Sequence, residues 1–410
     1  MKLTVATLIL SLLSTLARAK DMDLKTVEQL YLNYNFGQKA DAAGVRAAHE
    51  DLIRKYSEIL PKADATAMTG SDNTASNFLT ITQPIPFPTQ WSKEKQVLEL
   101  SERIADRTQV LDRQELLNVL RKAYFNVQLL EKKKVLYVES FAMVERFKRE
   151  SEQRFAKGFI PRAELYRSNV QYLDLERALL DLDSDLESSR RQLFVSLGQN
   201  ATRTNLGTDL KIGDAFLKMQ EKDLREQLAQ HSNETIAISQ FKSDSARLQV
   251  EAFPYHYLPT VSFKALIPFA QEDTQTTSYT ATFSWNIFNG GADRSDQRKT
   301  FALREQADYT LRDQVTQFAV RSEKTLNALL AGRASYFKLK EGLTMWEAIV
   351  ASDHQRFQKG IISSKDLSDD ITSYLNYASG VYQQTFELIS SLADFSLLVG
   401  KEDLFHQLLR

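Results

Sequence analysis

Four short stretches of the chain alternate between apolar and polar side chains, which is the pattern of a β-strand with one apolar face. The clearest is 278–288, where one face carries Tyr279, Ala281, Phe283, Trp285 and Ile287. The stretch 260–269 before it has Val261, Phe263, Ala265, Ile267 and Phe269 on one face. The first half of the chain has a second pair of such stretches at 63–69 and 75–85, which turn residues separate. We therefore expect four strands that form two hairpins.

Most of the remaining chain is predicted to be helical. The stretch 93–156 contains no proline or glycine and would, as one helix, be about 96 Å long at about 1.5 Å per residue. Gly158 and Pro161 then indicate a reversal, and a helix is expected at 162–197. The other helices that we expect are 24–59, 222–252, 292–358 and 365–399.

The helix expected at 162–197 carries a stripe of large apolar residues spaced by three, four or seven positions. Its members are Leu165, Tyr172, Leu175, Leu179, Leu182, Leu186, Leu193 and Leu197. Such a stripe requires a partner helix along its length, and the preceding helix, doubling back at Gly158, is the natural partner. Taken alone, the stripe favours a plain antiparallel coiled coil with no transport role.

The chain contains an internal duplication. The motif Arg-Phe-x-Lys-Gly at 154–158 recurs at 356–360, an offset of 202 positions (356 − 154). The same offset relates Tyr172 to Tyr374, and it relates the helix end Leu197-Gly198 to Val399-Gly400. Because one offset holds from the middle of each half to its end, we predict two structural repeats, each with a β-hairpin and a long helical hairpin.

This duplication predicts the organisation of the whole chain as mainly α with four β-strands. Its parts are a signal peptide at 1–19, repeat 1 at 20–198 with its helical hairpin at 93–197, a linker at 199–216, repeat 2 at 217–400 with its helical hairpin at 292–399, and a C-terminal segment at 401–410.

The N-terminus has the features of a secretory signal. Lys2 is followed by a mostly apolar region at 3–16 and a small-x-small cleavage site at 17–19, which predicts a mature chain from Lys20. A signal-anchor helix is the alternative, which the short apolar region disfavours. No later run approaches the roughly 18 apolar residues of a spanning helix, so any membrane crossing would use strands.

Composition argues against several classes of function. The 410 residues carry a net charge of −1, which gives no electrostatic reason to expect nucleic acid as a partner. With no cysteine there are no disulfides and no thiolate metal sites. The five histidines are scattered, and neither a phosphate-binding loop nor a hydrolase motif is present. We expect no enzyme activity, no cofactor and no metal.

The strands allow two interpretations. Alternation with one apolar face fits a membrane barrel, and it also fits a half-buried soluble sheet. Two facts favour the barrel: the strands are few beside so much helix, and aromatic residues gather there, namely Tyr255, Tyr257, Tyr279 and Trp285. Four strands cannot close a barrel, so the chain would have to oligomerise. The pattern alone does not choose among totals of about eight, twelve or sixteen strands.

The chain resembles the TolC-type outer-membrane efflux proteins over nearly all of its expected mature length. The resemblance rests on the sequence Phe-Ser-Trp-Asn-Ile-Phe-Asn-Gly-Gly at 283–291, on the two Arg-Phe-x-Lys-Gly turns, and on the Leu-Gly and Val-Gly helix ends. It implies a homotrimer with a twelve-stranded β-barrel in the outer membrane and an α-helical barrel in the periplasm. It also implies that the linker and the C-terminal segment build a middle belt. Such proteins are passive exit ducts for a periplasmic adaptor and an inner-membrane pump, in tripartite efflux or type I secretion.

The resemblance also implies roles for particular residues. An acidic ring that narrows the periplasmic end corresponds to Asp366 and Asp369, with Asp370 beside them, and Glu164 stands at the matching place in the first hairpin. Such a ring would favour cations. The same acids also suit an ordinary helix start, where caps and carboxylates satisfy the helix dipole, and for Glu164 the two interpretations are equally good.

The two turns are implied to contact the adaptor. Their residues are Lys157, Gly158, Phe159, Lys359, Gly360 and Ile361. Family members often have a small apolar residue before this glycine, whereas this chain has lysine in both turns and, in addition, Pro161. The residues implied to face the membrane are Tyr279, Phe283, Trp285 and Ile287.

A different class of function stays open at this point. A soluble periplasmic coiled-coil adaptor or scaffold would also carry a signal peptide and a helical hairpin. It would normally need one hairpin with flanking sheet domains, whereas this chain has two hairpins with strands between helices. Solubility that depends on detergent separates the two, because a channel requires detergent and a scaffold does not.

Overall fold

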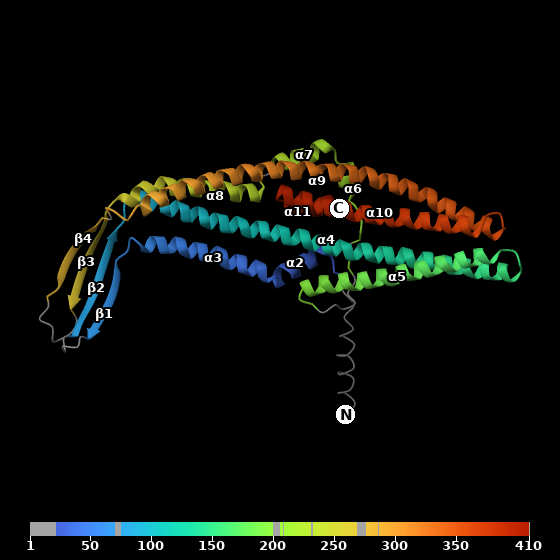
Figure 1. Cartoon of the computed structure of the whole chain (residues 1–410), viewed down its shortest axis with the longest axis horizontal. Coiled ribbons are helices and arrows are strands. Elements are labelled where there is room, and N and C mark those ends of the chain that lie inside the picture. Colours follow the sequence, from blue (N-terminus) through green and yellow to red (C-terminus); the bar gives the residue numbers. More distant parts are fainter. Residues whose placement is uncertain are drawn as a thin grey trace, which may run out of the picture. The chain divides into compact units, whose positions relative to one another are not determined.

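The computed structural model describes residues 22–69, 75–199, 206–207, 209–230, 233–268, 276–285 and 287–409. The predicted signal peptide at 1–19 and its cleavage site lie outside these residues. The helices and strands are labelled in Figure 1. In chain order they are α2 (Leu24–Tyr34), α3 (Phe36–Ser57), β1 (Lys62–Thr69), β2 (Ala75–Ile85), α4 (Pro88–Ala156), α5 (Arg162–Ser196), α6 (Asp214–Lys218), α7 (Glu221–Gln230), α8 (Glu234–Ala252), a 3-10 turn (Phe253–Tyr257), β3 (Thr260–Pro268), β4 (Ser278–Ser284), α9 (Ala292–Gln358), α10 (Ser364–Val399) and α11 (Glu402–Leu409).

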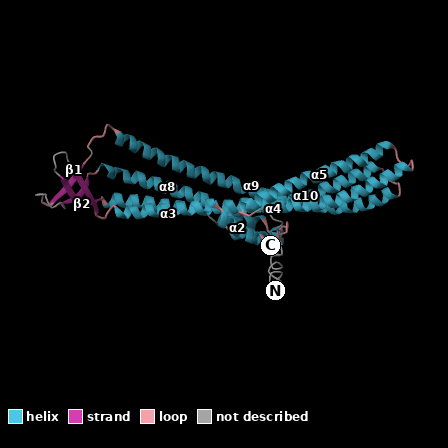
Figure 2. Cartoon of the chain, turned by 90° about the horizontal axis from the view of Figure 1, so that it is seen from below, coloured by secondary structure: helices cyan, strands magenta, loops and turns pink. Residues whose placement is uncertain are grey.

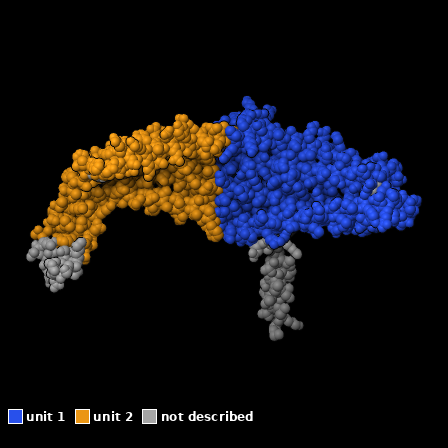
Figure 3. Space-filling view, in the orientation of Figure 1, with its two compact units in different colours: residues 1–35, 113–231, 320–410 blue, residues 36–112, 232–319 orange. Residues whose placement is uncertain are grey.

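The chain forms two compact units, coloured separately in Figure 3. Unit 1 comprises the described residues within 1–35, 113–231 and 320–410, and unit 2 comprises those within 36–112 and 232–319. Each unit therefore takes segments from both sequence repeats, and the long helices α4 and α9 contribute to both units. The boundaries of the repeats stay a prediction.

Unit 2 contains the four-stranded sheet, whose strands are magenta in Figure 2. Its antiparallel order β1-β2-β3-β4 follows the sequence, and all four strands are labelled in Figure 1. The register pairs Phe283 with Val261, Ala281 with Phe263, and Tyr279 with Ala265. Directly opposed residues point to the same side of a sheet, so the apolar faces predicted for β3 and β4 are one surface. The pairing continues this surface through β2 with Ile85, Ile81 and Leu79 and through β1 with Ala63 and Ala65.

The opposite face of the sheet is largely polar. The residues that share it include Lys62, Asp64, Thr66, Thr80, Thr82, Ser262, Lys264, Thr280 and Thr282. Because β1 and β4 each pair with one neighbour, both outer edges of the sheet are open in the described chain. The four predicted strands and their pairing as two hairpins are thus confirmed, and the structure adds that β2 and β3 join the hairpins into one sheet with an apolar and a polar face.

Unit 1 has two clusters of buried side chains. The central cluster joins α2, α4, α5, α10 and α11, and includes Tyr124, Phe125 and Phe405. At its edge the buried Arg121 Nε donates to Glu28 Oε1 at 2.7 Å, and His406 Nε2 lies 2.9 Å from Glu28 Oε2. Burial alone would raise the pKa of Glu28, but the bond with His406 and the charge of Arg121 outweigh it and lower that pKa.

The hairpin cluster, the second group of buried side chains, lies toward the turns. It includes Val144 and Phe147 of α4, Leu175 of α5, Phe357 at the end of α9, and Leu375 of α10. Every member of the apolar stripe predicted on α5 is buried or half-buried. The stripe is therefore confirmed as the inward face of α5.

Several predicted boundaries were wrong. The helix expected at 24–59 is two helices, because Asn35 adopts extended backbone between α2 and α3. The helix expected at 222–252 is likewise interrupted, and Asn233 caps the start of α8 by accepting from Thr235 N at 2.9 Å. The last strand ends at Ser284, short of 288, and the third ends at Pro268, while Phe269 lies outside the described residues.

Other differences extend the helices. The helix α4 begins at Pro88, before the expected 93, since proline fits the first helical position. The C-terminal segment forms α11, and the predicted linker runs into α6. Among the described residues, no helix combines the length and apolar character that a membrane crossing requires.

Candidate functional site: the paired hairpin turns

The two glycine turns of unit 1 have the same backbone geometry. Gly158 and Gly360 both have φ 75°, a left-handed conformation that glycine adopts without steric cost. In the first turn Phe159 N donates to Arg154 O at 2.9 Å and Gly158 N to Phe155 O at 2.9 Å. In the second, the equivalent bonds from Ile361 N and Gly360 N are 2.9 and 2.8 Å. Both are Schellman caps, and they obey the 202-residue offset.

The two turns meet around one open hollow of about 770 Å³. Its lining includes five of the six residues predicted at the tips, namely Lys157, Phe159, Lys359, Gly360 and Ile361, together with Glu164. Phe159 and Ile361 are largely exposed, at 75% and 62%. The structure therefore brings the predicted tip residues together, and it places a lysine and an exposed apolar side chain on each turn.

One arginine joins the two hairpins, and the sequence reasoning missed it. The Arg154 guanidinium lies 4.2 Å from the centre of the Phe357 ring, and its Nη2 donates to the carbonyls of Phe357 and, at 2.9 Å, Gln358. The Phe147 ring meets the same Phe357 ring edge-on at 5.0 Å between centroids. Arg154 and Phe357 both belong to the duplicated motif, and that duplication is the sequence signal that could have identified them. Arg154 thus clamps the end of α9 to α4.

Asp366 takes part in a capping box at the start of α10. Asp366 N donates to Ser363 Oγ at 3.2 Å, and Ser363 N and Oγ donate to Asp366 Oδ2 at 3.2 and 2.8 Å. The hydroxyl bond of Ser363, followed by its backbone bond, lowers the pKa of Asp366. The helix-start interpretation of this residue is therefore confirmed, and a role in a gate stays a prediction.

Asp370 lies beside Asp353, which the sequence reasoning did not single out. Partial burial, the hydrogen bond with Asp353, and the negative charges of Asp353, Asp366 and Asp369 raise the pKa of Asp370 to about 6. The raised pKa favours the protonated form of Asp370 under mildly acidic conditions. The proximity of the two residues could not be read from spacing, since Asp353 belongs to α9 and Asp370 to α10.

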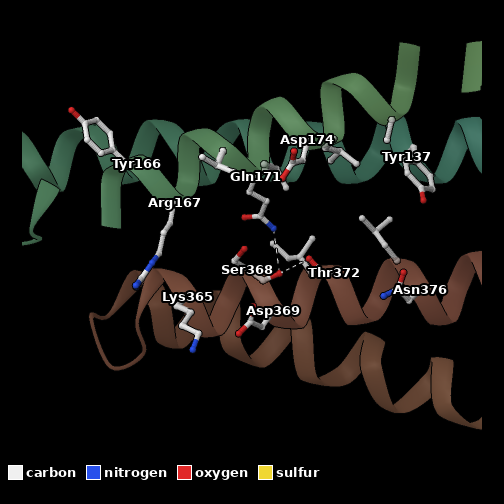
Figure 4. Close-up of a pocket in the computed structure, with 16 residues that line it drawn as sticks. Tyr137, Tyr166, Arg167, Gln171, Asp174, Lys365, Ser368, Asp369, Thr372 and Asn376 are labelled. Carbon is white, nitrogen blue, oxygen red and sulfur yellow. Dashed lines mark hydrogen bonds between the residues drawn. The ribbon is translucent and has the colours of Figure 1, made fainter. Parts of the chain in front are cut away.

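Asp369 lines a groove of about 560 Å³ between α5 and α10 (Figure 4). Across this groove Gln171 Nε2 donates to Ser368 O at 3.3 Å. Lys365 of α10 and Tyr166 of α5 also line the groove. Glu164 lines the hollow between the turns instead. Of the acids predicted for the gate, Asp369 and Glu164 therefore line two different surfaces, the α5–α10 groove and the hollow.

The residues predicted to face the membrane are exposed. Tyr279, Phe283, Trp285 and Ile287 are 61–82% accessible, and the register puts Tyr279 and Phe283 on the apolar surface of the sheet. Trp285 Nε1 donates to Tyr257 O at 3.0 Å, which holds two of the predicted belt aromatics together. Within the described residues, no three or more histidine, aspartate or glutamate side chains are grouped so that they could hold a metal.

Solved structures with the same arrangement include outer-membrane channels. The structure of the outer-membrane channel OprN matches with a TM-score of 0.81 at 15% identity, covering 93% of this chain and 90% of that chain. The Campylobacter jejuni outer-membrane channel CmeC matches at 0.77 and 16%, covering 92% and 85%. The Vibrio cholerae outer-membrane protein VceC matches at 0.77 and 14%, covering 92% and 96%.

The chain has the TolC-type fold. The resemblance that the turn and strand motifs indicated is thereby confirmed for the fold. Comparison with protein-family models gives no match, and neither does comparison with curated protein sequences. At 12–16% identity the similarity concerns the backbone, so individual residues keep the roles that their own contacts support.

Proposed function

We propose that this protein is an outer-membrane channel, the exit duct of a tripartite efflux or type I secretion system. The observation that carries the proposal is the match of over nine-tenths of the chain to solved outer-membrane channels. The substrate would pass through the duct without chemical change, driven by an inner-membrane pump.

The sheet supports a barrel assembled from three copies. It has an apolar and a polar face, and two open edges. In lipid each unpaired backbone group would cost several kcal/mol, so open edges require partners. Three copies, joined β4 to β1, would supply twelve strands, with the surface of Phe263, Ala281 and Phe283 toward lipid and the threonine-rich surface toward water.

The helical hairpins would extend into the periplasm as an α-helical barrel. Their turns, with Lys157, Phe159, Lys359 and Ile361 exposed around the shared hollow, would contact the periplasmic adaptor. Asp366, Asp369 and Asp370 would narrow the opening, and a splaying of the hairpins at Gly158 and Gly360 would widen it. A ring of such carboxylates favours cations over anions.

The test is the mass of the detergent-extracted protein, measured by light scattering with the detergent contribution subtracted, followed by conductance in planar bilayers. We expect three chain masses and discrete conductance steps. A control extraction without detergent should leave the protein in the membrane fraction. A monomer that is soluble without detergent would overturn the proposal in favour of a periplasmic coiled-coil scaffold.

A further inference from the structure

A further open hollow of unit 1, the three-helix hollow, is lined by residues of α4, α9 and α10. Its volume is about 690 Å³, within the range of about 300–1,000 Å³ that is typical of sites for small organic ligands. Its apolar floor consists of Ala142 and Met143 of α4 with Val350 and Ala351 of α9. Methionine is unbranched and flexible, so such a floor adapts to ligands of different shape.

One end of the three-helix hollow is acidic. Glu139 of α4 and Glu347 of α9 line it together with Tyr374 of α10. Burial, followed by the negative charges of Glu347 and Glu139, raises the pKa of the half-buried Tyr374. Both carboxylates therefore lie near the same phenol. Within the described residues neither carboxylate forms an ion pair, and neither belongs to a group that could hold a metal.

The other end of the three-helix hollow is basic. Arg146 and His354 line it, each seven residues after Glu139 and Glu347 respectively. The helices α4 and α9 both end at the paired turns, so they run in the same direction here. Seven residues are about two helical turns, which return to the same face after about 10.5 Å at about 1.5 Å per residue. The apolar floor therefore separates two carboxylates from a guanidinium and an imidazole.

We propose that the three-helix hollow binds a short zwitterionic peptide of about three residues, with free ends and apolar side chains. The peptide ammonium lies between the carboxylates of Glu139 and Glu347, to which it donates. The peptide carboxylate accepts hydrogen bonds from Arg146 and His354 at the opposite end. The apolar side chains pack on the floor between them.

The separation and the sign of the charges select this class of ligand. An extended peptide advances about 3.3–3.6 Å per residue, so three residues span about 10–11 Å and match the two ends of the hollow. A free amino acid carries both charges on one short unit and cannot reach both ends. A simple organic cation would leave Arg146 without a counter-charge, although a guanidinium presents a planar fork that fits a carboxylate.

This inference goes beyond the proposed channel and does not depend on it. All lining residues of the three-helix hollow belong to unit 1 of a single chain. Peptide binding is therefore expected whether the extracted protein contains one chain or three.

The test is isothermal titration calorimetry of the detergent-extracted full-length protein with the peptide Ala-Leu-Ala. We expect saturable binding of one peptide per chain. An N-acetylated and a C-amidated form of the same peptide each lack one charge and should bind about tenfold more weakly, because each loses charge-assisted hydrogen bonds. Free leucine should bind at least about tenfold more weakly than the peptide for the same reason.

Variants assign each end of the peptide to its residues. Glu139→Gln with Glu347→Gln should weaken binding of the free peptide about tenfold and leave the N-acetylated peptide unaffected, since that peptide has no ammonium. Arg146→Gln should weaken the free peptide likewise and leave the amidated peptide unaffected. The matched control is Glu145→Gln on the same helix, because Glu145 bonds to Arg149 at 2.6 Å and does not line the hollow. It should leave peptide binding unchanged.

The outcomes separate this inference from the proposed function. Absence of saturable binding overturns the inference, and so does equal affinity for the free peptide and either end-blocked form. The blocked peptides are compared on the unmodified protein, so this result stands even where a variant fails to fold. A trimeric mass without peptide binding overturns the inference alone. A soluble single chain that binds the peptide at both ends overturns the channel alone.

Discussion

The contact of Arg154 with the second turn leads to the sharpest prediction. Replacing Arg154 by alanine removes a guanidinium that stacks on Phe357 and donates to two carbonyls. A desolvated cation–π pair is worth about 2 kcal/mol, and a hydrogen bond from a charged group about 1.5–3 kcal/mol. Because these contributions share one side chain and are not additive, we expect a loss of about 2–4 kcal/mol.

The loss should be local, since the other members of the hairpin cluster remain. Amide hydrogen exchange measures it at Lys359, Gly360 and Ile361, whose N–H groups bond to carbonyls of the last turn of α9. At about 1.36 kcal/mol per factor of ten, exchange at these amides should become about 30-fold to 900-fold faster in Arg154→Ala. Arg154→Lys should give an intermediate value, because it keeps the charge and loses the planar fork.

The control for this prediction is Arg149→Ala. Arg149 is on the same helix and pairs with Glu145 at 2.6 Å, but both side chains are well exposed. Such pairs contribute about 0–1 kcal/mol, so exchange in the second turn should be unchanged. If Arg154→Ala leaves exchange at 359–361 as slow as in the wild type, the clamp contributes nothing and the reasoning from its geometry is refuted.

Three further predictions concern carboxylates. Because the pKa of Asp370 is raised to about 6, its contribution to stability is present below about pH 4 and is lost as pH rises through 6. The melting temperature should therefore fall over this pH range, and Asp370→Asn should abolish that dependence in thermal unfolding measured at a series of pH values. Glu28→Gln removes the carboxylate that pairs with the buried Arg121 and should cost about 3–5 kcal/mol in chemical unfolding at neutral pH, an effect absent if the pair is dispensable. For the gate, Asp366→Asn with Asp369→Asn should lower cation preference in planar bilayers, and unchanged selectivity would remove both residues from that role.

Patterns that repeat over a few residues could be read from the sequence. Alternation predicted all four strands, and the register shows that the apolar residues of β3 and β4 form one surface. The stripe on α5 and the glycines at 158 and 360 were read correctly for the same reason. A strand face, a helix face and a Schellman turn each depend on neighbours close in the chain.

What could not be read depends on neighbours distant in the chain. The raised pKa of Asp370 requires Asp353, which another helix brings close. The contact of Arg154 with Phe357 joins residues that are both in the duplicated motif, but the motif alone does not say that they meet. The helix breaks at Asn35 and near Asn233 were missed because asparagine inside a helical pattern is tolerated. Their capping roles show only in the folded chain, in the extended backbone of both residues and the side-chain bond of Asn233.

The different burial of Phe155 and Phe357 follows from tertiary contacts rather than from local sequence. Both phenylalanines stand in the same motif, yet one is 39% and the other 1% exposed. Phe357 lies against the Arg154 guanidinium and the Phe147 ring, both of which belong to α4. At the position that corresponds to Phe147 the second repeat has Ile349, and Arg356 bonds to Asp353 of its own helix. Equivalent positions of a duplicated motif therefore acquire different burial from the helices that pack around them.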